Sequence, residues 1–474
     1  MRPAKWGDSR NRATPLLRWF EVFWQALMFG SLPRFHQRYF SGGLSRDAGL
    51  LLASQCFCKA SGALILVILA RRLSADAIGQ FMFVVAVAQA FPTIGNLRLD
   101  IVVMRRVAAD PSQAGSLLAG LLGLRLASGV PFLISMVIAC MVMGGSGWPM
   151  ALGVGLFMLL DDIYACFATL LIGLGKSWAH AIVTTAVEIV YLILFSSVMW
   201  WSPSPTVLVG GNLFRASLLV VMAGLFTHRT LGALNVGWNT GLIKEGLPFA
   251  GLSLMMALRG RLDTLLLGVL AGHHAVGLFS LAFRVVLATQ FVPLTLSRLM
   301  IPKLARDGFD RNNRRTAAQI LTLLASIGLL GTGIAVTLSG PITTFFCGPL
   351  ARLVAPVLEG LAWLIPLSFL NQFLIDALQG LNEQKRLIRI NFVLFLVAVP
   401  LTWIMIAWFG LQGAVVARIA NALLMTLAIG WCVALLAWRT RKAGNENGQA
   451  SFDLGRDSHV QPSRTVERLP GGAG

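Results

Sequence analysis

Long apolar stretches alternate with short polar segments over most of this chain. An apolar stretch of about 20 residues is long enough to cross the lipid core as a helix. Twelve stretches reach spanning length, at residues 48–70, 79–99, 115–142, 150–173, 179–200, 206–227, 247–270, 276–297, 318–340, 353–379, 388–409 and 412–438. The second is interrupted by Pro92 and Gly95, and the tenth is long. The pattern predicts an all-α polytopic membrane protein with about 12 transmembrane helices.

The composition supports solvation by lipid. Of 474 residues, 56% are hydrophobic and 12% are charged, whereas soluble domains contain roughly 25% charged residues. The formal net charge of +19 would also suit a nucleic-acid-binding protein. Such proteins gather their cations on one solvated face, but here the cations separate apolar runs, so we exclude that class.

The positions of Lys and Arg between the apolar stretches predict the orientation of the chain. With the N-terminus inside, the inside segments contain 29 of these residues and the outside loops contain 3. Cytoplasmic loops are enriched in Lys and Arg. We therefore expect both termini to be cytoplasmic.

Two parts of the sequence repeat at an offset of 198 residues. Ile78-Gly79-Gln80-Phe81 corresponds to Val276-Gly277-Leu278-Phe279, and Arg105-Arg106-Val107-Ala108 lies opposite Lys303-Leu304-Ala305-Arg306. This offset moves the first two predicted helices onto the seventh and eighth. Six helices per half is an even number, so both halves keep one orientation. This is a parallel repeat, which predicts two six-helix lobes with a cleft between them.

These features divide the chain into five segments. The basic N-terminal segment contains aromatic residues between Leu16 and Phe29 that suit an interfacial helix, or else it is a poorly ordered tail. It is not a signal peptide, because Arg18 and Glu21 interrupt its apolar stretch and no small-residue cleavage site follows. The predicted segments are 1–46 (basic, cytoplasmic), 47–227 (N-lobe, helices one to six), 228–246 (cytoplasmic linker), 247–438 (C-lobe, helices seven to twelve) and 439–474 (disordered cytoplasmic tail).

The cysteines do not suggest a metal site or a disulfide. We interpret all six as small hydrophobic residues, and we expect no cofactor and no bound metal. They are Cys56, Cys58, Cys140, Cys166, Cys347 and Cys432.

Charged residues inside the predicted spans are the candidates for function. The cations are Lys59, Arg125, Arg215, Arg259, Arg261, Arg284 and Arg418. Each would cost about 2.5–3.5 kcal/mol at a helix centre facing lipid, so we expect them to face a hydrated cavity or a partner. Lys59, Arg125, Arg215 and Arg259 fall near the predicted bilayer midplane, and cations come from both halves. We therefore predict that they line the cleft between the lobes.

Acidic residues in the spans leave several pairings open. They are Asp161, Asp162, Glu188, Asp263 and Glu359, with Asp376 near an inside end. Arg259 and Asp263 are four residues apart and can pair on one helix. Arg125 and Arg215 either remain available to substrate or bridge to Asp161, Asp162 or Glu188. An arginine-rich hydrated cleft suits an anion, because guanidinium groups match phosphate oxygens.

Short segments of the chain resemble a known family. Leu69-Ala70-Arg71-Arg72-Leu73-Ser74, leading to Ile78-Gly79-Gln80-Phe81, resembles the first outside loop of the polysaccharide (lipid-linked oligosaccharide) flippases of the multidrug/oligosaccharidyl-lipid/polysaccharide exporter superfamily. Further similarity lies in Arg261 to Gly268 with Val276 to Ala282, in Ile301 to Ala305 and in Phe409 to Ala414. The resemblance covers roughly residues 45–438, and the long basic N-terminal extension departs from the family pattern.

The resemblance implies a function and a set of site residues. It implies a flippase that moves an undecaprenyl-diphosphate-linked oligosaccharide across the bacterial cytoplasmic membrane by alternating access, for O-antigen, capsule or exopolysaccharide synthesis. The expected partners are this lipid-linked oligosaccharide, membrane lipids and a polysaccharide polymerase with other assembly proteins. The expected substrate-binding residues are Lys59, Arg125, Arg215, Arg259, Asp263, Arg284 and Arg418, and the candidate coupling-ion residues are Asp161, Asp162 and Glu188.

Two alternatives remain open. A cation-coupled drug exporter of the same superfamily would use the acids as its cation site. A membrane-embedded glycosyltransferase or polymerase is disfavoured, because the outside loops are short and contain no paired carboxylates.

Overall fold

The computed structural model describes residues 43–90, 99–143, 147–231, 240–290, 293, 311–381 and 383–457. Every element in these ranges is a helix. Within these ranges, nine helices are long and apolar enough to cross a membrane. A helix satisfies its backbone groups internally, which is what lipid requires. The chain is therefore a multi-pass helical membrane protein.

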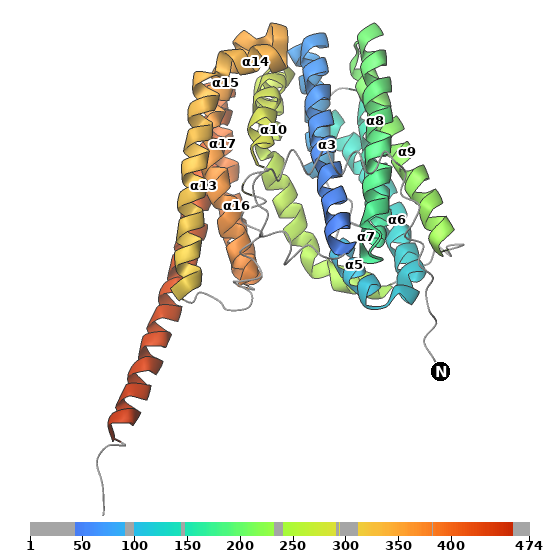
Figure 1. Ribbon diagram of the computed structural model, residues 1–474. Helices are drawn as coiled ribbons and strands as arrows, with labels where there is room; N and C mark the ends of the chain where they lie inside the picture. Colours follow the sequence, from blue (N-terminus) through green and yellow to red (C-terminus); the bar gives the residue numbers. More distant parts are fainter. Residues whose placement is uncertain are drawn as a thin grey trace, which may run out of the picture.

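The N-terminal half consists of seven α-helices and a short 3₁₀ segment (Figure 1). They are α3 (Gly43–Arg72), α4 (Ala75–Ala90), α5 (Leu99–Ala109), η1 (Pro111–Gln113), α6 (Ala114–Val142), α7 (Trp148–Gly173), α8 (Ser177–Trp201) and α9 (Pro205–Leu231). The expected second helix, 79–99, is found as α4, ending at Ala90, while the helix that follows begins at Leu99. Asp110 caps η1, and the hydrogen bonds that it accepts from Ser112 and Gln113 lower the pKa of its carboxyl.

The C-terminal half contains two very long helices that each turn at a glycine. Its elements are α10 (Thr240–Ala288), α13 (Arg311–Thr337), α14 (Ser339–Cys347), η2 (Gly348–Leu350), α15 (Ala351–Ala362), α16 (Leu364–Gly380) and α17 (Gln384–Asp457). Within α10, Gly272 has φ 82°, and within α17, Gly410 has φ 54°. Positive φ is strained for residues with a Cβ, and glycine adopts it freely.

Close contacts show that the chain reverses at both glycines. Gly260 and Phe283 line one cavity, although a straight helix would separate them by about 35 Å. Likewise, a Cβ on Gly413 would overlap the carbonyl oxygen of Met405, on the other side of Gly410. Each long helix is therefore two antiparallel segments. This is compatible with twelve crossings, but the number twelve and the orientation of the termini stay predictions.

The two copies of the sequence repeat pack against each other. A Cβ on Gly79 would overlap the carbonyl oxygen of His273, and one on Gly277 would overlap that of Ala75. Position 273 is 75 plus 198, and 277 is 79 plus 198, so the two contacts are equivalent under the repeat. Between them, the Nδ1 atom of His274 lies 3.1 Å from the Oδ2 atom of Asp76, again at a separation of 198. The α4 helix and the second segment of α10 therefore meet about a local two-fold axis.

Further contacts join the halves at the same end of the molecule. Arg71, in the last turn of α3, donates a 2.9 Å hydrogen bond to the carbonyl oxygen of Phe345 in α14. Figure 1 shows the end of α3 beside α14, opposite the end from which α17 extends. The loop predicted between the ninth and tenth spans is thus largely α14, since its apolar sequence packs as a short helix.

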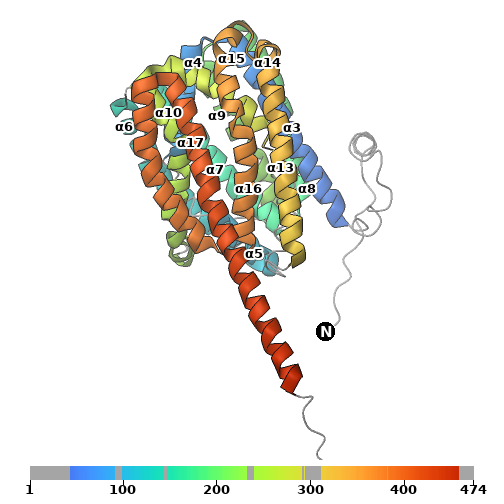
Figure 2. The ribbon, with the colours of Figure 1, turned by 90° about the vertical axis from the view of Figure 1, so that its left-hand side faces the viewer.

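The structure differs from the sequence prediction at the C-terminal tail and at the tenth helix, and it does not describe the N-terminal segment. The segment 16–29, the expected interfacial helix, lies outside the described residues, as does Lys303 to Arg306 of the repeat. The tail expected to be disordered from 439 is helical as far as Asp457, where α17 continues past the bundle (Figure 2). A helix that is already nucleated propagates at little cost, which explains this extension. The expected span 353–379 is divided between α15 and α16 at Trp363.

Candidate functional site

The charged residues of the spans form two separate groups. One lies between α6, α7, α8 and α9 of the N-terminal half, and the other lies around α10 and α17 of the C-terminal half. They differ in how completely the arginines are matched by acids.

In the N-terminal half, arginines pair with aspartates from a neighbouring helix. The Arg125 guanidinium on α6 lies 3.3 Å from the Asp162 carboxylate on α7. The Arg215 guanidinium on α9 lies 2.8 Å from the Asp161 carboxylate. Thus the adjacent acids of α7 bridge to helices on both sides. Of the alternatives left open by the sequence, the bridged arrangement is the one present.

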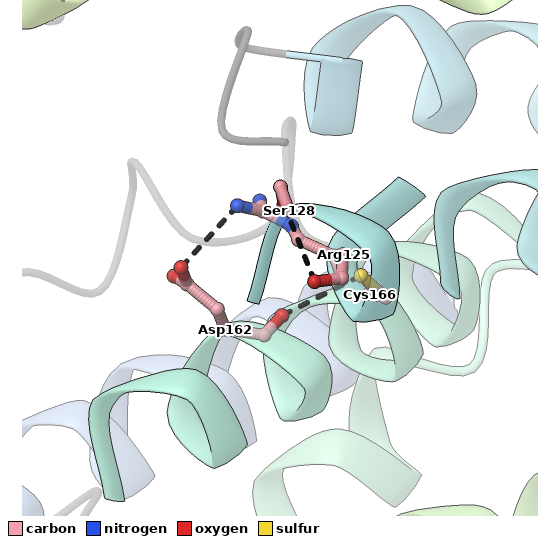
Figure 3. A network of polar contacts seen from close by, with 4 residues as sticks. All are labelled: Arg125, Ser128, Asp162 and Cys166. Atoms are coloured by element: carbon pink, nitrogen blue, oxygen red, sulfur yellow. Dashed lines mark hydrogen bonds and ion pairs between the residues drawn. The ribbon is translucent and has the colours of Figure 1, made fainter. Parts of the chain in front are cut away.

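The Arg125–Asp162 pair belongs to a small polar network (Figure 3). The Ser128 hydroxyl donates to the carbonyl oxygen of Arg125, at 3.2 Å. The Cys166 thiol donates to the carbonyl oxygen of Asp162, at 3.4 Å. Arg125 is only 3% exposed, so this charge is held inside the helix bundle.

The third acid of this half, Glu188, lies between α8 and α3. It is 7% exposed and accepts a 2.8 Å hydrogen bond from the Ser61 hydroxyl. Lys59 on the same α3 is exposed, and no described residue forms an ion pair with it. The structure therefore places Glu188 but not Lys59 inside the bundle.

In the C-terminal half, one of the four span arginines pairs with an aspartate. Asp263 is 2% exposed, and its carboxylate lies 2.5 Å from the Arg418 guanidinium on α17. The expected pair with Arg259 is absent. Arg259 instead donates a 2.6 Å hydrogen bond to the Asn391 amide oxygen. The physical reason is that the last helix brings Arg418 across to Asp263, while Arg259 faces the preceding segment of α17.

The other two span arginines of this half, Arg261 and Arg284, form no ion pair with a described acid. Arg284, which is mostly buried, donates to the sulfur of Met82 on α4 at 3.2 Å. Arg261 lines a cavity of about 350 Å³ together with Gln89 of α4 and Arg418. This cavity lies between the halves and has no acid among its described lining residues.

A second cavity of about 330 Å³ adjoins the first and lies within the C-terminal half. Both are lined by Gly260, Phe283, Leu287 and Arg418. The second is also lined by Arg259 and Asp263 and by polar amides from α16, from α17 and from the turn after α10. The two cavities together therefore bring Arg259, Arg261, Arg418 and Asp263 to one polar space, while Arg125 and Arg215 lie elsewhere.

The amides of this second cavity were not identified from the sequence. They are Gln290, Asn371, Gln372, Asn391 and Asn421. A signal was available, because uncharged amides in apolar spans are also costly to bury without partners. Charge alone does not single them out, because amides carry none.

Comparisons with known proteins identify a family and a shared fold. Residues 44–306 match the model of a family described as polysaccharide biosynthesis protein. No curated protein sequence matches the chain.

Three solved structures share the fold at low sequence identity. The lipid II flippase MurJ in an inward closed conformation has a TM-score of 0.62 at 13% identity, covering 81% of this chain and 87% of that one. An inward-facing multidrug resistance MATE transporter of the MOP superfamily has a TM-score of 0.58 at 15% identity, covering 80% and 95%. A MOP superfamily transporter from Pyrococcus furiosus, whose reversed pocket polarity suggests a different function, has a TM-score of 0.54 at 15% identity, covering 83% and 95%.

These likenesses establish a transporter fold of the kind found in the MOP superfamily. The family match covers more than half of the chain, from α3 through α9 and the whole of α10. The chain therefore belongs to the polysaccharide biosynthesis protein family.

Proposed function

We propose that this protein is a flippase that translocates an undecaprenyl-diphosphate-linked oligosaccharide across the bacterial cytoplasmic membrane by alternating access. The product would serve O-antigen, capsule or exopolysaccharide synthesis, together with a polysaccharide polymerase and other assembly proteins. In this proposal the protein shelters the headgroup and makes or breaks no covalent bond.

The excess of arginine at the paired cavities carries the proposal. Arg259, Arg261 and Arg418 line this space, and Asp263 is the only acid among its described lining residues. The three arginines and the one aspartate together carry a net charge of two positive units, which suits a diphosphate. A cavity for cationic drugs would need the opposite sign.

The location of the cavities fits a lipid-linked substrate. They lie between transmembrane segments, at the contact of the two halves and beside it. A diphosphate and sugar held there avoid the cost of entering hydrocarbon, which makes unaided flipping slow. The polyprenyl chain would remain in the surrounding lipid. The matching polysaccharide biosynthesis protein family and the likeness in fold to MurJ, a lipid II flippase, support the same class of substrate.

The acids of the N-terminal half are proposed to take part in coupling. Asp161 and Asp162 are held by arginines, whereas Glu188 is held by a hydroxyl. Glu188 therefore forms no ion pair with a described residue, so a coupling cation bound there would separate none. We assign to it the coupling role, with the membrane potential acting on the anionic substrate as a further driving force.

The test is complementation of a strain lacking the gene. Arg261→Ala should abolish surface polysaccharide and cause the lipid-linked oligosaccharide to accumulate on the cytoplasmic side, while Arg261→Lys should retain part of the function. Arg386→Ala is the matched control, because that arginine pairs with Glu383 outside the cavities. Normal polysaccharide in the deletion strain, with increased sensitivity to cationic drugs, would favour the drug-exporter alternative.

A further inference from the structure

The cavity within the C-terminal half has a wall of unusual chemistry for a membrane segment. Six uncharged polar side chains line it, from both segments of α17, from α16 and from the turn that follows α10. They are Gln290, Ser368, Asn371, Gln372, Asn391 and Asn421. Each carries polar atoms that must find partners in a region solvated by lipid. So many from separate elements indicate a site that binds polar groups.

Hydrogen bonds between these side chains and their neighbours fix the orientation of the wall. The Asn421 amide donates to the Thr402 hydroxyl at 3.1 Å, and the Gln290 amide donates to the Ser368 hydroxyl at 2.5 Å. Asn391, the acceptor from Arg259, donates in turn to the carbonyl oxygen of Leu387 at 2.9 Å. The amides are therefore held in place before any ligand arrives, which reduces the entropy lost on binding.

Asn371 supplies an acceptor that lacks a donor. Its amide nitrogen donates to the carbonyl oxygen of Ala422 at 3.0 Å. Its amide oxygen is buried, and no hydrogen-bond partner for it exists among the described residues. The residue lines the cavity and is 8% exposed. A buried acceptor without a donor is rare in folded proteins, and here it marks a position for the hydroxyl of a ligand.

The adjoining cavity also contains an amide oxygen that lacks a donor, at its boundary with the N-terminal half. The amide oxygen of Gln89 on α4 is buried, also without a hydrogen-bond partner among the described residues. Arg418 lines both cavities, and its guanidinium lies 4.7 Å from the Phe283 ring, which lines both as well. One molecule could therefore place an anionic group by Arg261 and Arg418 and a polyhydroxylated group against the amides.

We infer that the amide-lined cavity binds a sugar of the substrate through its hydroxyl groups, next to an arginine site for the diphosphate. This inference rests on the proposed function and adds a sugar subsite to it. Sugar hydroxyls donate and accept hydrogen bonds, as amides do. An apolar drug would leave the amides without partners, and sites built to bond a hydroxyl reject analogues without one. A volume of about 330 Å³ is at the lower end for ligand pockets, so it suits part of a glycan.

Binding to the purified full-length protein in lipid nanodiscs tests the inference. The two probes are undecaprenyl diphosphate carrying the oligosaccharide of the host strain and bare undecaprenyl diphosphate. The wild type should bind the glycan-bearing lipid about tenfold more tightly or better, since one hydrogen bond changes affinity by up to about tenfold. Asn371→Leu should bring this ratio toward one while the affinity for the bare lipid stays unchanged.

A second cavity variant and a matched control complete the experiment. Asn421→Ser removes the amide at a half-buried position and should reduce the same ratio even if Asn371→Leu fails to fold. Asn212→Leu is the control, because that amide bonds the carbonyl oxygen of Leu208 within α9, away from the cavity. It should leave both affinities unchanged.

The outcomes separate the subsite from the function. Equal binding of both lipids by the wild type, or an unchanged ratio in Asn421→Ser, would overturn the sugar subsite and leave a diphosphate flippase intact. Failure of the wild type to bind either lipid would overturn the proposed function as well.

Discussion

At the residue scale, the arginines of the spans divide by the partners that the structure gives them. Arg125, Arg215 and Arg418 each meet an aspartate on another helix. Arg259 and Arg284 meet an amide and a thioether instead. Away from the cavities, a charge matched by an acid contributes chiefly to holding helices together. At the cavities, three arginines face one described acid, so positive charge remains available to an anionic ligand.

The Arg125–Asp162 pair provides a test of this division. Asp162→Asn leaves the Arg125 charge, which is 3% exposed, without its acid. Removing one partner of a buried pair costs about 3–5 kcal/mol. We expect a lower thermal unfolding midpoint in detergent and lower membrane abundance.

The double variant Arg125→Gln/Asp162→Asn removes both charges and should recover much of that stability. Glu383→Gln, which removes the acid of a half-exposed pair with Arg386, should have little effect. If Asp162→Asn were as stable as the wild type, the structural role of Arg125 would be wrong, and substrate binding would again be the role to test for it.

The sequence identified these charged residues but could not assign their partners. Arg259 and Asp263 are one turn apart, and a single helix allows them to pair. Asp263 and Arg418 are 155 residues apart in the sequence, so their contact exists only once α10 and α17 have packed. Periodicity reports which residues share a helix face, whereas pairing between helices depends on rotation and depth, which the pattern of apolar residues leaves free.

At the element scale, the contact between α4 and the second segment of α10 is the most closely packed part of the fold. Gly79 and Gly277 each lie directly against a backbone carbonyl of the other element. Small residues permit helices in lipid to approach closely, and dispersion forces then hold them. The repeat places an equivalent glycine in each of the two elements. The contact can therefore be tested from either side, with one substitution in α4 and another in α10.

Gly79→Ala and Gly277→Ala should each disrupt this contact. An added Cβ would overlap a backbone atom, which cannot move aside as a side chain can. Overpacking of this kind costs about 1–3 kcal/mol, measurable as a lower unfolding midpoint and lower abundance in membranes. Gly62→Ala on α3 is the control, since a Cβ there meets nothing within 4 Å and alanine favours helix. Normal stability of both variants would show that the helices are not in contact at these glycines.

Element boundaries show which features a linear pattern can predict. The spans expected at 150–173 and 179–200 correspond to α7 (Trp148–Gly173) and α8 (Ser177–Trp201), because apolar runs with polar ends define them. The expected 353–379 is divided between α15 and α16 at Trp363. Of the expected 79–99, the structure describes residues 79–90 within α4 and Leu99, where α5 begins. The short helix α14 was not predicted. Its position depends on packing against α3 and on the two spans that it connects, and the local pattern of apolar residues does not report either of these.

At the scale of the whole molecule, the structure joins its halves at the end opposite the α17 extension. Arg71 of α3 bonds the Phe345 carbonyl oxygen of α14, and Asp76 of α4 bonds His274 of α10. If the positive-inside prediction holds, this is the outer end, and the conformation is closed there. Alternating access requires these contacts to separate in each cycle while the halves remain folded.

A cross-link between positions 76 and 274 should therefore stop transport. We would place Asp76→Cys and His274→Cys in a background with the six native cysteines replaced by alanine, and treat membranes with a short, cleavable bifunctional thiol reagent. The parent side chains lie 3.1 Å apart, so the two thiols are within reach of such a reagent. Translocation of the lipid-linked oligosaccharide into the outer leaflet should fall to the background level and return after the linker is cleaved.

The controls isolate movement at this contact from loss of the side chains. Both residues are exposed in part, with side-chain exposures of 61% for Asp76 and 52% for His274, so losing a pair in such solvated surroundings costs at most about 1 kcal/mol. The untreated double variant and each treated single variant should therefore transport normally. Full transport in a completely cross-linked sample would mean that the halves do not separate along α4 and α10, and the substrate would then need a route that leaves this contact closed.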